Sequence, residues 1–342
     1  MARLVVPEML EVLKGSPLAA FVAALVVSLA VTPLVRQLAL RAGAVAKPDA
    51  RRLHPGEIAQ WGGIALFLGV LAAALVWRQP TSDDVRLLSP SSNPADIRQT
   101  VASVHLSTTF FLCGGAMLLL GMLDDTFELR AWQKFGGQVV ITYFLWRGGI
   151  KITTLPFTSG LQALSDPVSL LLTMLWVLGL TNGVNFIDGV DGLAAGVGAI
   201  GAGSLCLIEL DKAPWAACAL AALCGSCVGF LRYNFHPAKI FLGDAGALLL
   251  GFWLATIALT AAAKTAAATT LALPLLVLGI PILDALWAVF RRTLAGKAPW
   301  VADRGHIHHR LLSKGLSPVK TVLIIYGVGI ALGAVALIFS RG

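Results

Sequence analysis

Charged residues are scarce in this chain of 342 residues: Asp, Glu, Lys and Arg make up 13% of it, whereas 57% of the residues are hydrophobic. Soluble domains carry about a quarter charged residues, so this composition indicates an integral membrane protein. No stretch is polar enough to form a separate soluble domain, and we expect one transmembrane domain over residues 1–342. The net charge of +8 does not indicate nucleic-acid binding, because basic cytoplasmic loops and anionic lipid or substrate phosphates explain it.

Zinc-binding cysteine patterns and internal repeats are also lacking. Cys224 and Cys227 form a C-x-x-C, but no second pair accompanies them, and we interpret the cysteines as packing residues. The segment Gly196–Gly201 matches G-x-G-x-x-G, yet it lies inside an apolar run and follows no strand, which argues against a dinucleotide site. The lack of a repeat argues against a transporter built from duplicated halves.

Long apolar runs make up most of the chain. A helix needs about 20 apolar residues to span a bilayer. The sequence therefore predicts an all-α polytopic membrane protein with about ten transmembrane helices, and residues 150–160 alternate enough to suggest a short outer hairpin. The expected spans are 17–40, 61–77, 104–123, 135–146, 168–181, 192–210, 213–231, 245–263, 269–290 and 321–340.

Lys and Arg are divided unevenly between the two sets of loops that these spans define. The richer set is expected on the cytoplasmic side, which places both termini on the extracytoplasmic side. The acidic and histidine-rich motifs fall on the same inner face. The loops expected to form a cytoplasmic active site are 41–60, 124–134, 182–192, 232–244 and 291–320.

Two adjacent carboxylates, Asp124 and Asp125, directly follow an apolar run. A carboxylate near hydrocarbon costs about 2.5–3.5 kcal/mol on insertion scales, so such residues are usually retained for function. A bound Mg2+ would relieve their mutual repulsion. The pair would also suit an active site in which one carboxylate is a base and the other is a metal ligand. We favour a catalytic role over a solvated helix end. Lys134 is then a phosphate contact, although a membrane-interface anchor is an equal alternative.

A second polar motif places Asn182, Asn185, Asp188 and Asp191 at intervals of three residues, with glycines between them. On a helical turn this spacing stacks oxygen atoms on one face, and the glycines allow the backbone to approach a ligand. Mg2+ takes oxygen ligands and retains waters and substrate phosphates in its shell. We therefore favour a metal and phosphate site over a polar capping loop.

Two further aspartates lie near segment ends. Asp244 stands between Gly243 and Ala245, where it could cap a helix, but as a third acidic motif on one membrane face it is better interpreted as a metal ligand. Asp284 lies near the inner end of the ninth span and either orients the site or reaches the interface.

Basic and histidine-rich loops complete the inner face. Imidazole and guanidinium groups in His306, His308, His309 and Arg310 suit a phosphorylated substrate better than zinc, because no cysteine accompanies them. A surface loop without function is the alternative. Lys47 lies in a basic loop that is either a lipid anchor or a substrate contact.

Taken in this order, the motifs resemble those of the polyprenyl-phosphate N-acetylhexosamine-1-phosphate transferases. The resemblance covers roughly residues 40–340 and rests on Asp124-Asp125 through Lys134, Asn182–Gly192, Phe241–Gly246 and His306–Leu312. The His-x-His-His-Arg form is closer to the N-acetylglucosamine branch than to the peptidoglycan translocase. Ala247 replaces the usual serine, and Gln60–Gly63 departs from the commoner Pro-Arg-x-Gly-Gly.

This resemblance implies ten membrane helices, a cytoplasmic site and Mg2+, with Mn2+ as a substitute. By position it makes Asp244 and Asn185 the metal ligands, and Asp124 or Asp125 the base. Asp188 and Asp191 would be further catalytic residues. The substrate contacts would be Lys47, Lys134, Asn182, Asp191, His306, His308, His309 and Arg310.

The expected reaction starts lipid-linked cell-envelope glycan synthesis in a bacterial plasma membrane. Polyprenyl (undecaprenyl) phosphate attacks UDP-N-acetylglucosamine and UMP is released. Direct attack is our interpretation, with an aspartyl-phosphate intermediate as the open alternative. Phospho-N-acetylmuramoyl-pentapeptide transfer is an alternative within the same chemistry, and an ion-coupled transporter is an alternative from another class. Nucleic acid is not an expected partner, and a homodimer is left open.

Overall fold

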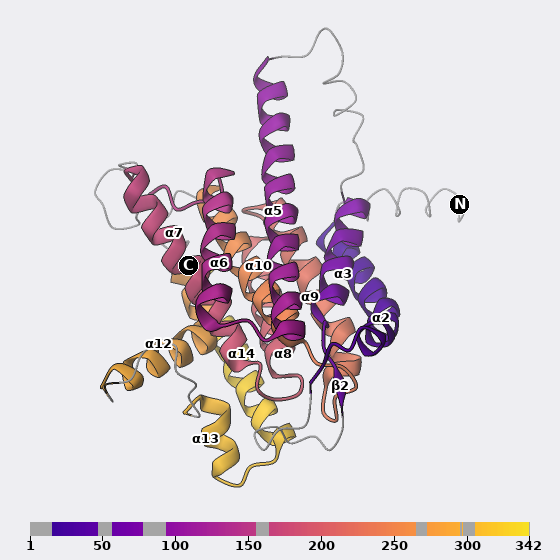
Figure 1. Cartoon of the computed structure of the whole chain (residues 1–342). Helices are drawn as coiled ribbons and strands as arrows, with labels where there is room; N and C mark the ends of the chain where they lie inside the picture. Colours follow the sequence, from indigo (N-terminus) through magenta and orange to yellow (C-terminus); the bar gives the residue numbers. More distant parts are fainter. Residues whose placement is uncertain are drawn as a thin grey trace.

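The structure, a computed structural model, describes residues 16–46, 57–77, 94–154, 164–264, 272–294, 296 and 305–341. Its helices form one bundle (Figure 1). The bounds are α2 Pro17–Arg41, α3 Gly63–Trp77, α5 Pro94–Phe127, α6 Ala131–Arg147, α7 Asp166–Ile187, α8 Leu193–Glu209, α9 Pro214–Asn234, α10 Gly243–Lys264, α11 Ala272–Val277, α12 Gly279–Leu294, α13 Ile307–Ser313 and α14 Pro318–Arg341.

The all-α membrane fold expected from the sequence is confirmed. Within the described part of the chain, six helices are long and apolar enough to cross a membrane, in α2, α5, α7, α9, α10 and α14, and α3 and α8 are shorter apolar helices. The α10 span is 94% buried, whereas those in α2 and α14 are 28% buried, so α10 is the centre of the bundle. Apolar side chains such as Leu18 and Ile338 face outward, as expected where the solvent is lipid. Ten crossings and the placement of the termini stay predictions.

Glycine allows α5 to approach the start of α10 closely. A Cβ atom added at Gly121 would lie 2.4 Å from the Cα of Ala245, which no side chain can accommodate without displacement of one helix. Helix α3 also approaches this residue closely, because a Cβ atom added at Gly63 would lie 2.6 Å from the carbonyl carbon of Ala245. Small residues at such crossings are typical of membrane helices. These contacts place the C-terminal end of α5 directly against the first turn of α10.

We expect Gly121→Val to separate α5 from α10. Overpacking of this kind costs about 1–3 kcal/mol, and here it also displaces the acidic residues that follow Gly121. The melting temperature in detergent should fall by several degrees, with a matching loss of activity. Gly136→Val is the control, because nothing lies within 4 Å of a Cβ added at Gly136. An unchanged melting temperature for Gly121→Val would contradict this account of the helix contact.

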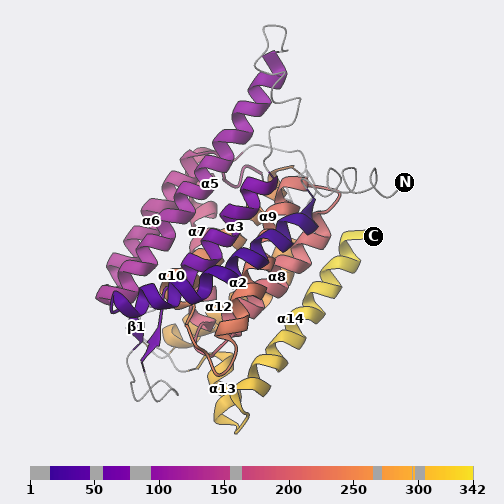
Figure 2. The ribbon, with the colours of Figure 1, turned by 90° about the vertical axis from the view of Figure 1, so that its right-hand side faces the viewer.

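A small strand pair joins two of the loops at the site end. Strand β1 (Val45–Ala46) pairs antiparallel with β2 (Ile58–Ala59), and Ala59 forms a parallel bridge to Ile240 in the loop before α10. The N–H of Phe241 donates to the carbonyl of Ala59 at 2.8 Å. These bonds hold the loop after α2 against the loop that leads into α10. Figure 2 shows β1 and α13 at the same end of the bundle.

The predicted spans that differ most from the helices are 269–290 and 104–123. The predicted span 269–290 is wrong as a single helix: it is divided into α11 and α12, with Leu278 between them. Pro281 lacks the N–H that would bond to the carbonyl of Val277, which accounts for the break. Helix α5 begins at Pro94, ten residues before the predicted start, and rises beyond its neighbours at the end opposite α13 (Figures 1 and 2). Residues 150–154 of the predicted outer hairpin form no strand, and residues 155–163 lie outside the described chain.

Candidate active site

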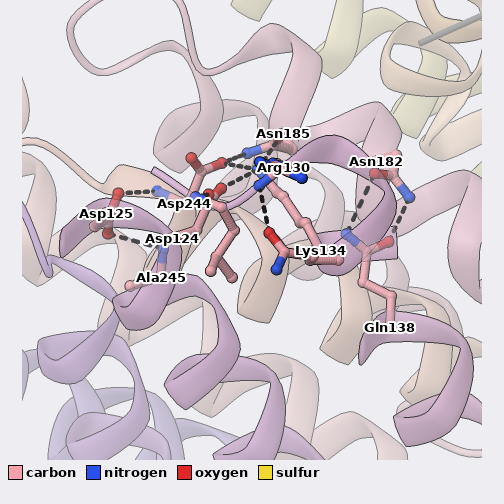
Figure 3. Close-up of polar contacts among 11 residues, drawn as sticks. Asp124, Asp125, Arg130, Lys134, Gln138, Asn182, Asn185, Asp244 and Ala245 are labelled. Atoms are coloured by element: carbon pink, nitrogen blue, oxygen red, sulfur yellow. Dashed lines mark hydrogen bonds and ion pairs between the residues drawn. The ribbon is translucent and has the colours of Figure 1, made fainter. Parts of the chain in front are cut away.

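Lys134, on the first turn of α6, is the centre of a polar cluster contributed by four helices. Its Nζ lies 2.7 Å from Oδ2 of Asp124 and 2.6 Å from Oδ1 of Asp244. The amide oxygen of Asn185 is 3.5 Å from the same nitrogen, and the Asn185 amide donates to Oδ1 of Asp244 (Figure 3). The structure therefore brings together four residues that the sequence singled out, and these residues lie between 10 and 120 positions apart in the chain.

Asp125 makes different contacts from its neighbour. Its two carboxylate oxygens accept the backbone N–H groups of Asp244 at 2.8 Å and Ala245 at 3.1 Å (Figure 3). The first N–H groups of a helix have no partner within it, so Asp125 caps α10 from α5. Gly243 makes this possible, because it has a φ of +71° and a Cβ there would lie 2.6 Å from Oδ2 of Asp125. Asp124 is thus the member of the pair that contacts Lys134.

Asn182 is paired with a residue that sequence reasoning missed. Its amide donates to Oε1 of Gln138 at 2.7 Å, and the Gln138 amide faces back toward the Asn182 oxygen at 3.4 Å. Gln138 is fully buried on α6, one turn after Lys134. This amide pair clamps α6 to α7 and so holds Lys134 opposite Asn185. A glutamine inside the predicted span 135–146, one turn from a lysine, was the available signal.

The expected stacking of oxygen atoms over residues 182–191 is wrong beyond Ile187, because α7 ends there and Asp188 is its C-cap. Asp191 turns to the loop before α10, where Oδ2 lies 2.8 Å from Nδ1 of His236 and accepts the N–H of Ala238 at 3.1 Å. Nearby, the buried Asn234 accepts the N–H of Gly192 at 3.1 Å. Asp191 therefore joins two loops rather than the Lys134 cluster, and its predicted roles stay predictions.

The histidine motif forms a second cluster beside the first. Nδ1 of His306 lies 2.7 Å from Oδ2 of Asp284, and the His306 ring lies 5.4 Å from that of Phe186, measured between centroids. Since Phe186 follows Asn185, the end of α7 separates the two clusters. The ring of His308 is parallel to that of His306, with centroids 5.9 Å apart.

His308 is buried against the turn after α7. A Cβ added at Gly189 would lie 2.5 Å from Nε2 of His308, so the ring packs directly on this glycine. Only 1% of His308 is exposed, and neither ring nitrogen has a hydrogen-bond partner among the described residues. Burial, with the neighbouring His309 and His306, lowers the pKa of His308 to about 4, so the ring is neutral at pH 7. Arg310 is exposed on α13, and Lys47 lies outside the described residues.

Comparison with known proteins agrees with this geometry. The sequence model of glycosyl transferase family 4 matches residues 107–262, which include Asp124, Lys134, Asn185 and Asp244. The decaprenyl-phosphate N-acetylglucosaminephosphotransferase of Mycolicibacterium smegmatis is 36% identical, over 90% of this chain and 79% of that protein. The chain belongs to glycosyl transferase family 4. A protein of Bacillus subtilis named "Probable undecaprenyl-phosphate N-acetylglucosaminyl 1-phosphate transferase" is 34% identical, over 94% of this chain and 84% of that protein.

A more distant relative extends the comparison. The undecaprenyl-phosphate alpha-N-acetylglucosaminyl 1-phosphate transferase of Escherichia coli K12 is 26% identical, over 85% of this chain and 75% of that protein. The family resemblance inferred from the motifs is therefore confirmed. Membership of glycosyl transferase family 4 also identifies the chain as an enzyme rather than an ion-coupled transporter.

The Lys134 cluster in this family 4 protein has the donor atoms that Mg2+ prefers. Among the described residues no three His, Cys, Asp or Glu side chains form a ready-made metal site. The cluster instead offers the carboxylates of Asp124 and Asp244 and the amide oxygen of Asn185, all directed at one cationic atom. Mg2+ is usually bound by one or two carboxylates together with substrate phosphates and waters. The residues present fit such an ion.

Proposed function

We propose that this protein transfers N-acetylglucosamine 1-phosphate from UDP-N-acetylglucosamine to a polyprenyl phosphate, with release of UMP. The observation that carries the proposal is the convergence of Asp124, Asp244 and Asn185 on the ammonium group of Lys134 at one end of the bundle. Relatives named for this transfer support the choice of sugar and lipid. The reaction would begin the assembly of a lipid-linked cell-envelope glycan.

In the proposed reaction, an oxygen of the lipid phosphate attacks the β-phosphorus of the sugar nucleotide. A new P–O bond forms, the bond from the β-phosphorus to the bridging oxygen breaks, and UMP leaves with the electron pair. Such transfers depend chiefly on positioning and on neutralisation of phosphate charge. Mg2+, held by Asp244 and Asn185 beside Asp124, would supply part of that neutralisation. Lys134 would hold a diphosphate oxygen, and Asp124 would keep the lipid phosphate ionised.

The second cluster suits the nucleotide. His308 and His309 lie on the short helix α13 and His306 is its N-cap, and the exposed Arg310 guanidinium can pair with a phosphate. The neutral ring of His308 can donate one hydrogen bond and accept another. The end of α7 would then lie between the nucleotide and the reacting phosphates, since Asn185 and Phe186 face different clusters.

The site is proposed to lie at the cytoplasmic face of a bacterial plasma membrane. The predicted spans divide Lys and Arg unevenly between the two sets of loops, and the richer set includes the segments that carry the Lys134 cluster, which supports a cytoplasmic location. The soluble sugar nucleotide would enter from the cytoplasm, while the tail of the polyprenyl phosphate stays in the bilayer. Apolar side chains exposed beside the cluster, including Phe127, Trp132 and Phe135, could contact that tail.

An assay with the purified protein and two sugar nucleotides tests the proposal. With undecaprenyl phosphate and Mg2+, we expect UMP and a glycolipid from UDP-N-acetylglucosamine, and at least about 100-fold less product from UDP-N-acetylmuramoyl-pentapeptide. EDTA should stop the reaction, and Mg2+ or Mn2+ should restore it. Preference for the pentapeptide nucleotide would replace the proposed substrate. Full activity in EDTA would remove the metal from the proposal.

A further inference from the structure

Asp284 is a buried carboxylate whose two oxygens hold one short helix. Its side chain is 6% exposed and lies on α12, outside the Lys134 cluster. Oδ2 lies 2.7 Å from Nδ1 of His306, and Oδ1 accepts the backbone N–H of Ile307 at 2.9 Å. Burial of a carboxylate is costly unless its oxygens are bonded, and here both are. One side chain thus fixes both a ring and the first turn of α13.

The contact with Asp284 determines which nitrogen of His306 carries a proton. An ionised carboxylate only accepts hydrogen bonds, so Nδ1 must be the donor. Nε2, on the opposite side of the ring, is left for another partner. A hydrogen bond of this kind sets the tautomer and the ring orientation of functional histidines.

Aromatic contacts hold the His306 ring from other directions, and a cationic contact supports one of these aromatic partners. His306 lies between Phe186 and the parallel ring of His308. The guanidinium of Arg292, two turns after Asp284 on α12, lies 5.6 Å from the centroid of Phe186. Asp284 and Arg292 are both buried on α12, so this helix supports the histidines and the end of α7 together.

We propose that Asp284 is a positioning residue for sugar-nucleotide binding, acting through His306. It holds Nδ1 protonated so that Nε2 faces the nucleotide, and it fixes the helix that carries His308 and His309. This rests on the proposed function, in which the histidine cluster binds the nucleotide. The consequence is that loss of the Asp284 contact weakens nucleotide binding more than it slows the chemical step at Lys134.

Asp284→Asn tests the proposal, because asparagine keeps the shape of the side chain and can still accept from Ile307. Its amide nitrogen then faces Nδ1 of His306 as a donor, which moves the ring proton to Nε2. We expect KM for UDP-N-acetylglucosamine to rise at least about tenfold, kcat to fall less than about threefold, and the melting temperature to stay within a few degrees. Asp166→Asn is the matched control, because the Asp166–Lys151 ion pair is exposed.

Two further measurements separate positioning from a structural role. In a His306→Gln background, Asp284→Asn should add less than about twofold to KM, because the two residues act as a unit. Nitrogen-15 spectra of labelled histidine should show His306 protonated on Nδ1 in the parent protein and on Nε2 in Asp284→Asn. If Asp284→Asn fails to fold, His306→Gln must itself raise KM about tenfold. Additive effects of Asp284→Asn and His306→Gln on KM, or an unchanged His306 tautomer, would overturn the proposal. Inactivity of the parent protein toward UDP-N-acetylglucosamine would overturn the proposed function instead.

Discussion

Asp244→Asn is expected to lower kcat by at least about 10³-fold, which corresponds to about 4 kcal/mol of transition-state stabilisation. Oδ1 of Asp244 contacts both Lys134 and Asn185, so its negative charge holds the cluster together. Asparagine has the same shape but no charge, and it is a weak ligand for Mg2+. The backbone N–H of residue 244 would still donate to Asp125, so α10 should keep its cap. Release of UMP from UDP-N-acetylglucosamine is the measurement.

The control separates loss of chemistry from loss of folding. Asp211→Asn removes the same charge from an exposed turn between α8 and α9, and its activity should match that of the parent protein. The elution profile of Asp244→Asn in detergent should match that of the parent, and a cooperative melting transition should show that the variant still folds. Near-normal turnover by Asp244→Asn would remove Asp244 from the proposed metal ligands.

The acidic pair on α5 shows how adjacent residues can take separate roles. Each carboxylate oxygen of Asp125 accepts a hydrogen bond from a backbone N–H group of α10. Asp124 instead accepts the N–H of Leu129 and contacts Lys134. The cap therefore fixes the position of Asp244 on the first turn of α10, and Asp124 lies against the lysine. Of the two candidates for the base, the geometry favours Asp124.

Much of the Lys134 cluster could be predicted because its members break apolar runs. A carboxylate or lysine at the end of such a run stands out from composition alone, and the shared side of the membrane follows from the order of the spans. The family resemblance narrowed the expected metal ligands to Asp244 and Asn185, which stays a prediction. The sequence does not show which of the two adjacent aspartates contacts Lys134, because Asp124 and Asp125 are the same residue type at neighbouring positions.

The missed features depend on contacts between distant segments. The Gln138–Asn182 pair requires α6 and α7 to be adjacent, and the Asp191–His236 contact requires two loops to meet. Two-residue strands are too short to show alternation, so the pairing of β1 with β2 left no signal. The break in the helix at Leu278, by contrast, did leave a signal in the sequence, because Pro281 lies within the predicted span.

Lys134→Met should strengthen metal binding in the absence of substrate while lowering turnover about 10²- to 10³-fold. In the structure the Lys134 ammonium lies within 2.7 Å of carboxylate oxygens from Asp124 and Asp244, which are oxygens that a divalent cation would use. A lysine in that position competes with the metal for the same negative charge. Its removal should therefore lower the Kd for Mn2+ at least about tenfold. The turnover loss has a different cause, because the diphosphate loses a cationic partner.

Electron paramagnetic resonance of free Mn2+ measures this affinity without any substrate. Arg130→Met is the control, since it removes the same charge one helical turn earlier. Among the contacts of the described residues, the Arg130 side chain makes none with the three oxygens around Lys134. A general electrostatic effect would change the Kd for Mn2+ equally in both variants, whereas direct competition predicts a clearly larger change for Lys134→Met. Equal changes would show that Lys134 does not share its oxygens with the metal. A larger change combined with lost turnover would mean that Lys134 leaves the carboxylates when the ion enters and becomes available to the diphosphate.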